Sequence, residues 1–189
     1  RLASVPPLDP AARNPFAGND CTAVWMDYNN AGTTSPPEVR VKTFNITTGY
    51  TSGSEVFLNG GLAGAQDDVV VAGNGTSTTQ IAAWTSSVSS PQDVMCRRII
   101  DRVADPAIET ACSTDTVADQ NQPAAAMSPG GTYAVAWTGV DAGGKGIWVR
   151  FWDADGTPIT DDVAANTTVV GEQDWPALAW DSNGRLLVV

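Results

Sequence analysis

The chain has 189 residues, of which 42% are hydrophobic and 16% charged, which is long enough for one domain with a hydrophobic core. Its formal net charge of -11 and sequence pI near 4.1 argue against nucleic acid and anionic membranes as partners, because such polyanions would be repelled. No apolar run approaches the length of a membrane span.

The first nine residues, 1–9, are predicted to form an extended lead-in, because Pro6 and Pro7 disfavour a ladder of hydrogen bonds there. A first repeat follows over about residues 10–62, with its opening strand at 10–12 and Trp25 in the next strand. The connection Tyr28–Pro37 is longer than its later counterparts, so we place Tyr28 among the candidate ligand-binding residues.

Two further repeats occupy about residues 66–115 and 120–168, and residues 173–189 contain the first hairpin of a fourth. The clearest copy of the unit, Asp119–Trp137, is a polar step, an apolar run, a Ser-Pro-Gly-Gly turn and a second apolar run, which predicts a β-hairpin. The positions that recur in register are Trp25, Trp84 and Trp137, and Gln66, Gln120 and Gln173. We predict that the three tryptophans are buried at equivalent positions.

Residues of the second apolar run alternate between large and small side chains. Tyr133, Val135 and Trp137 point to one face of the strand, and Ala134 and Ala136 point to the other. Neither face is polar, so the strand is covered on both sides. This pattern predicts sheets stacked face to face, with large side chains over the small face of a neighbour.

Four short strands in each repeat of about 50 residues predict an all-β, β-propeller-like fold with four-stranded antiparallel blades. The chain holds three blades plus the first hairpin of a fourth, and a β-solenoid is the competing architecture. A propeller closes with four to eight blades. We therefore expect further repeats or other protein subunits to complete the ring and to cover Leu178 and Trp180 on its open flank.

Third strands carry basic residues and fourth strands carry acidic ones. We expect cross-strand ion pairs that join Lys42, Arg98 and Arg150 to Glu55, Glu109 and Asp162, in that order.

The repeat of Gln-x-x-Pro-Ala-x-Ala, Ala-Val-Ala-Trp and Val-Arg-Phe-x-Asp-Ala-Asp-Gly resembles that of large bacterial cell-surface and secreted proteins, most of them uncharacterised. The resemblance covers Asp119–Val189 best and Pro10–Ala118 less closely. It implies a propeller-like fold and an extracellular or cell-surface location, with the periplasm as an alternative.

The chain has three cysteines. Pairing across the hairpin turn of the second repeat places Cys96 opposite Cys112, which predicts a disulfide if the Cα separation falls within about 4.4–6.8 Å. Reduced, buried thiols are the alternative. Cys21 is left over, and a bridge would agree with an oxidising compartment.

Histidine is absent, which excludes a Ser-His-Asp triad or a Cys-His pair built from this chain alone. Carboxylate chemistry of the glycoside-hydrolase kind remains open, since it needs only two Asp or Glu across a cleft. The candidate acids near blade edges are Asp67, Asp68, Asp119, Asp141 and Asp174. Turn formation and solvation are the competing explanation for all five.

Calcium is the candidate cofactor, and no other cofactor is expected. Asp153, Asp155 and Asp161 provide oxygen ligands around a turn containing Gly156, although a plain hairpin turn explains the same residues. Aromatic residues suggest glycans as ligands, because sugar rings stack on exposed rings. Trp175, which stands where other repeats carry Asp68 and Gln122, is the main candidate, followed by Trp148, Asp174 and Tyr28.

Two functions follow from these features. The first is a non-catalytic extracellular or cell-surface module for adhesion, glycan binding or assembly into a larger surface structure. The alternative is a fragment of a secreted propeller glycosidase or lyase whose catalytic residues lie outside this chain. The missing histidine and the acidic surface favour the first, so we expect a chain that is not itself an enzyme.

Overall fold

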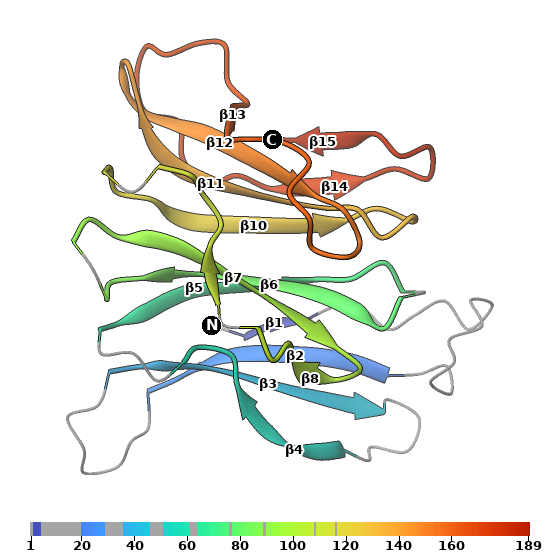
Figure 1. Cartoon of the computed structure of the whole chain (residues 1–189). Coiled ribbons are helices and arrows are strands. Elements are labelled where there is room, and N and C mark those ends of the chain that lie inside the picture. Colours follow the sequence, from blue (N-terminus) through green and yellow to red (C-terminus); the bar gives the residue numbers. More distant parts are fainter. Residues whose placement is uncertain are drawn as a thin grey trace.

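The protein folds into four antiparallel sheets that lie face to face, as the computed structural model in Figure 1 shows. The structure describes residues 2–4, 20–28, 36–45, 51–60, 64–75, 77–88, 90–107, 109–115 and 117–189. Within these ranges no helix is long and apolar enough to cross a membrane. The prediction of an all-β fold with three blades and the first hairpin of a fourth is confirmed.

Consecutive strands are neighbours in each sheet, except that β9 of the second blade pairs with β7 and not with β8. The first blade contains β1 (Leu2–Ser4), β2 (Asp20–Asp27), β3 (Glu38–Asn45) and β4 (Thr51–Phe57). The second contains β5 (Gln66–Ala72), β6 (Thr79–Ser86), β7 (Asp93–Ile100), β8 (Val103–Ala104) and β9 (Thr110–Ala111), with both β8 and β9 pairing with β7. The third contains β10 (Asn121–Met127), β11 (Tyr133–Asp141), β12 (Gly144–Trp152) and β13 (Val163–Ala164). The last hairpin is β14 (Leu178–Trp180) and β15 (Leu186–Val188).

The first blade begins earlier than the predicted boundary at residue 10. Strand β1 lies inside the predicted lead-in and pairs with β2, with Leu2 opposite Trp25. The strand predicted at residues 10–12 lies outside the described residues, as do residues 29–35 of the long connection after Tyr28.

Apolar side chains fill the space between successive sheets, large against small. Ile81 and Ala83 of the second blade pack against Val135 and Trp137 of the third. On the other side of β11, the small residues Ala134 and Ala136 belong to the cluster against which the last hairpin packs. The predicted stacking of large faces on small ones is therefore confirmed.

The three repeated tryptophans are not equally buried. Trp84 and Trp137 are 0% and 1% exposed, as predicted, whereas the prediction for Trp25 was wrong because this residue is only half-buried. Val24 and Met26 beside it face the second blade, and alternate residues of a strand point to opposite faces. Trp25 therefore points to the flank of the first blade that faces away from the second.

Leu178 and Trp180 were predicted to lie on the open flank of the last hairpin, but the structure buries their face and exposes the other one. Leu178 and Trp180 pack against the third blade and are partly buried, so they do not form the open flank. The residues that alternate with them on the other face include Leu187, which is 61% exposed, and Val189 at the end of the chain is 73% exposed. The prediction had the correct hairpin and the wrong face.

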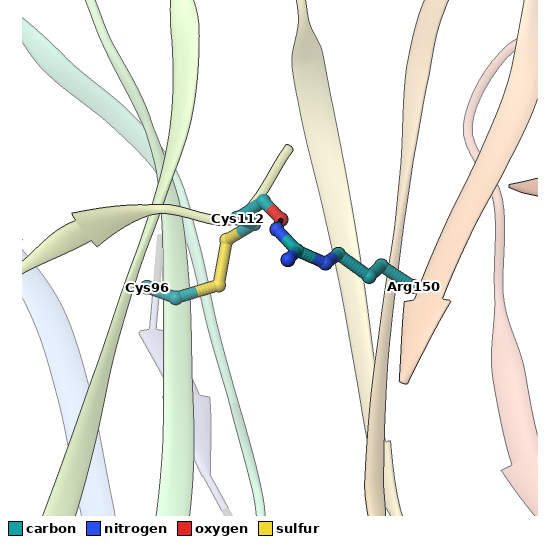
Figure 2. Close-up of a disulfide and its surroundings, with 3 residues drawn as sticks. All are labelled: Cys96, Cys112 and Arg150. Atoms are coloured by element: carbon teal, nitrogen blue, oxygen red, sulfur yellow. Dashed lines mark hydrogen bonds between the residues drawn. A yellow bond between two sulfur atoms is a disulfide. The ribbon is translucent and has the colours of Figure 1, made fainter. Parts of the chain in front are cut away.

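The predicted ion pairs of Arg98 and Arg150 were wrong. Arg98 pairs with Asp105, at 2.7 Å between Nη2 and Oδ2, instead of Glu109. Arg150 donates from Nε to the Thr160 carbonyl and from Nη1 to the Cys112 carbonyl, each at 3.0 Å, as Figure 2 shows for Cys112. A guanidinium has five donors, and here two of them satisfy main-chain carbonyls instead of the carboxylate of Asp162.

Arg97, not Arg98, is the counterpart of Arg150, because Met95 lies opposite Trp84 as Trp148 lies opposite Trp137. Arg97 donates from Nη1 to the Leu58 carbonyl of the first blade at 2.7 Å. Each of these two arginines therefore ties its blade to the outer part of the preceding one.

The predicted disulfide between Cys96 and Cys112 is confirmed, with a Cα separation of 5.4 Å (Figure 2). Cys96 lies directly opposite Thr110 in the ladder, so the bridge runs diagonally to the residue two positions further on. Cys112 is fully buried, and Cys21 keeps a free, half-buried thiol.

Candidate functional site

One edge of the stacked sheets gathers the starts of the first strands and the ends of the second strands. Gln66 at the start of β5 lies opposite Ser86 at the end of β6, and Asn121 of β10 lies opposite Thr138 of β11. We call this edge, from Tyr28 to Trp175, the rim. Connections between second and third strands leave from the same edge.

Three equivalent residues on the rim adopt a left-handed backbone conformation. Asp68, Gln122 and Trp175 have φ angles of 52°, 56° and 58°. In β5 and β10 the ladder shifts register at this position, which marks a β-bulge. A positive φ is uncommon for non-glycine residues and is an outlier for a bulky one such as Trp, and such backbone strain concentrates at functional sites.

Hydrogen bonds to the preceding blade hold this conformation. The backbone N–H of Gln122 donates to the Thr85 hydroxyl at 3.2 Å, and the N–H of Trp175 donates to the Thr138 hydroxyl at 3.2 Å. The Thr138 hydroxyl also donates to Oε1 of Gln122 at 2.8 Å. Both threonines are buried, so the side chains at the left-handed positions project from a rigid base.

Trp175 is 54% exposed on this base, as the sequence analysis expected for a residue at that position. Its N–H also lies 3.3 Å from Oε1 of Gln122, so two acceptors orient its backbone. The prediction of Trp175 as a candidate came from its repeat position. Neither Thr138 nor Gln122 was predicted as its support, although the 53-residue spacing of Gln122 and Trp175 was the available signal.

Tyr28 and Asp67 meet at the first-blade end of the rim. The Tyr28 hydroxyl donates to Oδ1 of Asp67 at 2.9 Å, and the Tyr28 side chain is 63% exposed. This hydrogen bond raises the pKa of Tyr28, with smaller contributions from burial and from the charges of Asp67 and Asp68. An aromatic ring and two carboxylates therefore lie together there.

Asp174 lies at the other end of the rim, next to Trp175, in a charged cluster. Lys145 Nζ lies 3.5 Å from Oδ2 of Asp174 and 3.8 Å from Oε2 of Glu172. All three side chains are at least one-third exposed. Such exposed pairs contribute little to stability, and they leave a carboxylate and an ammonium group partly exposed at the residue that precedes Trp175.

Trp148 is not brought to the exposed rim. Its indole N–H donates to the Val140 carbonyl at 3.2 Å, and its ring passes so close to Gly139 that a Cβ there would lie 2.8 Å from Cδ1. Two other candidate acids accept backbone hydrogen bonds. Asp141 accepts the N–H of Gly143 in a local turn, and Asp119 accepts the N–H of Gln92, which lies far from it in the chain.

The candidate calcium ligands lie at the far end of β12 in a hairpin turn. Asp153 accepts the N–H of Ala154, Asp155 accepts the N–H of Thr157, and Asp161 is exposed. The hydrogen bonds from Thr157 lower the pKa of Asp155. No group of three or more Asp, Glu, Cys or His suited to a metal occurs in the described part of the chain.

The fold is that of β-propeller blades, with three blades and the first hairpin of a fourth in this chain. Comparison with protein-family models and with curated proteins finds no match. Among solved structures, the chain is similar over its whole length to an α-L-arabinanase of Penicillium chrysogenum complexed with arabinobiose, with a TM-score of 0.63, 12% identity and 57% of that chain covered. It is similar in the same way to the GH93 α-L-arabinofuranosidase of Fusarium graminearum with arabinobiose, with a TM-score of 0.57, 12% identity and 57% coverage. The chain thus spans little more than half the length of these propellers.

Proposed function

We propose that this chain is part of an extracellular β-propeller that acts on glycans, and that the rim binds the carbohydrate. Trp175 is the observation that carries the proposal. Its ring is exposed while its backbone is held in a rare conformation by two hydrogen bonds, which is a costly arrangement for a residue with no role. The neighbouring side chains Asp174, Lys145 and Gln122 supply acceptors and donors for sugar hydroxyls.

The two similar propellers, both complexed with arabinobiose, support the glycosidase alternative over a purely non-catalytic module. The alternative placed the catalytic residues outside this chain; we extend it here and propose the rim carboxylates Asp67, Asp68 and Asp174 as candidates within the chain. Further repeats or another subunit would complete the ring and the rest of the cleft. A buried disulfide agrees with an oxidising, extracellular compartment.

Binding of oligosaccharides to the chain, measured by calorimetry with arabino-oligosaccharides and a panel of other glycans, tests this proposal. The Trp175→Ala variant should weaken binding at least about tenfold, which corresponds to about 1.4 kcal/mol. Ile159→Ala is a matched control, because Ile159 is 56% exposed and follows the far end of β12. Unchanged affinity in Trp175→Ala would show that the rim is not the binding surface.

Hydrolysis separates the two functions. If Asp174→Asn or Asp68→Asn retains glycan binding and loses release of reducing sugar, the chain contributes to a glycosidase. Binding without any release of sugar supports the non-catalytic module instead.

A further inference from the structure

A small cavity lies between the second and third blades, near the rim end of β11, where Gly139 and Val140 line it. Its volume is about 40 Å³, and oxygen-bearing side chains line it together with two indole rings. These residues are Asp115, Gln120, Asp162, Trp137 and Trp148. No basic side chain lines the cavity in the described part of the chain, so its lining carries two carboxylates without a counter-charge.

Gln120 lines this cavity and carries an unpartnered side-chain oxygen. Its side chain is 2% exposed, and its Nε2 donates to the Asp115 carbonyl at 2.7 Å. That bond decides which end of the amide is the oxygen, because a flipped amide would lose the donor. Oε1 of Gln120 is buried and has no hydrogen-bond partner.

Asp162 also has one side-chain oxygen that is hydrogen-bonded and one that has no partner. Its Oδ2 accepts hydrogen bonds from the N–H and hydroxyl of Thr114, both at 2.9 Å, and from the N–H of Asp115 at 3.3 Å. Its Oδ1 is buried and has no hydrogen-bond partner. Two unpartnered acceptors that line one cavity are unfavourable unless something there neutralises them.

The equivalent glutamine of the second blade is satisfied within the protein. Oε1 of Gln66 accepts the indole N–H of Trp84 at 2.9 Å. The unpartnered oxygen of Gln120 is therefore not a general property of the repeat. It coincides with the cavity that Asp115 and Asp162 line.

We propose that this cavity binds a calcium ion, with Oδ1 of Asp162, Oε1 of Gln120 and the carboxylate of Asp115 as protein ligands. Calcium takes only oxygen ligands, tolerates irregular geometry and accepts water in the remaining positions. The cavity has room for one ion, since a water molecule needs about 10–15 Å³. Asp115 is itself exposed, and its Oδ1 accepts the N–H of Val117 at 2.8 Å. A lone water would satisfy the two unpartnered acceptors but would bring no positive charge to the two carboxylates that line the cavity. With three protein ligands, we expect a dissociation constant of about 10⁻⁴–10⁻³ M, as in extracellular calcium modules.

Terbium luminescence tests the site directly, because Tb³⁺ replaces Ca²⁺ and is excited by a nearby indole, and two indoles line this cavity. Saturable emission that Ca²⁺ displaces is expected. Asp162→Asn should weaken Tb³⁺ binding at least tenfold, and Trp148→Phe should lower the emission while Ca²⁺ still raises the unfolding temperature. Gln120→Glu adds a charge to the ligand set and should tighten binding, which tests the site with a variant that removes no ligand.

Asp153→Asn is the matched control, because it alters the hairpin turn outside the cavity. If emission is lost in Asp153→Asn and kept in Asp162→Asn, calcium binds the turn and the cavity proposal is wrong. Absence of saturable Tb³⁺ emission together with no effect of Ca²⁺ on unfolding would also overturn it and assign a water to the cavity.

Discussion

Arg150 is the residue whose loss should best reveal how adjacent blades are held together. In Arg150→Met the side-chain stem remains, whereas the hydrogen bonds to the Thr160 and Cys112 carbonyls are removed. A hydrogen bond to a charged donor contributes about 1.5–3 kcal/mol, and the Cys112 carbonyl lies at a fully buried residue (Figure 2). We expect Arg150→Met to lower the free energy of unfolding by about 3 kcal/mol.

Urea denaturation followed by intrinsic tryptophan fluorescence measures this loss as a lower midpoint with an unchanged m-value. Arg97→Met should behave similarly, because Arg97 bonds the Leu58 carbonyl in the same way. Arg185→Met is the control, since the Arg185 side chain is 78% exposed and its guanidinium pairs with Asp181 at the surface, so its loss should cost less than about 1 kcal/mol. If Arg150→Met destabilises the protein no more than Arg185→Met, the bonds between blades do not stabilise the fold.

Two further predictions concern the interior. Replacing Cys96 and Cys112 with Ala should lower the free energy of unfolding by about 3 kcal/mol, because the bridge closes a loop with a sequence separation of 16. If both thiols are freely alkylated in the unreduced, denatured protein, the bridge does not exist. Burial raises the pKa of Tyr133 to about 12, above its ordinary value of 10.0, so the unfolded chain loses this proton at lower pH than the folded protein. Stability should therefore fall by about 1.4 kcal/mol per pH unit between pH 10 and 12, and the fall should be smaller in Tyr133→Phe. An ultraviolet titration in which all tyrosines ionise together near pH 10 would contradict this assignment.

The repeat in the amino-acid sequence was enough to predict the blades. Trp84, Trp137 and the Ala face of β11 recur because every sheet must fill the same space against its neighbour, so local spacing carries global information. The disulfide was also predictable, since a cross-strand pair within one hairpin depends on nearby residues. The exposed position of Trp175 followed from comparison of the repeats.

Tertiary structure decided what lies between the blades. The choice of Arg97 over Arg98 depends on a register difference of one residue, and one residue reverses the face of a strand. Arg97, Arg150 and the N–H of Trp175 each have an acceptor in the preceding blade, and no local pattern reveals these contacts. The same holds for the cavity at Gln120, because its unpartnered oxygen arises only where two sheets meet. The periodicity of the sequence determines which side chains lie on each face of a strand. Contacts between sheets depend instead on the relative placement of residues that are distant in the sequence.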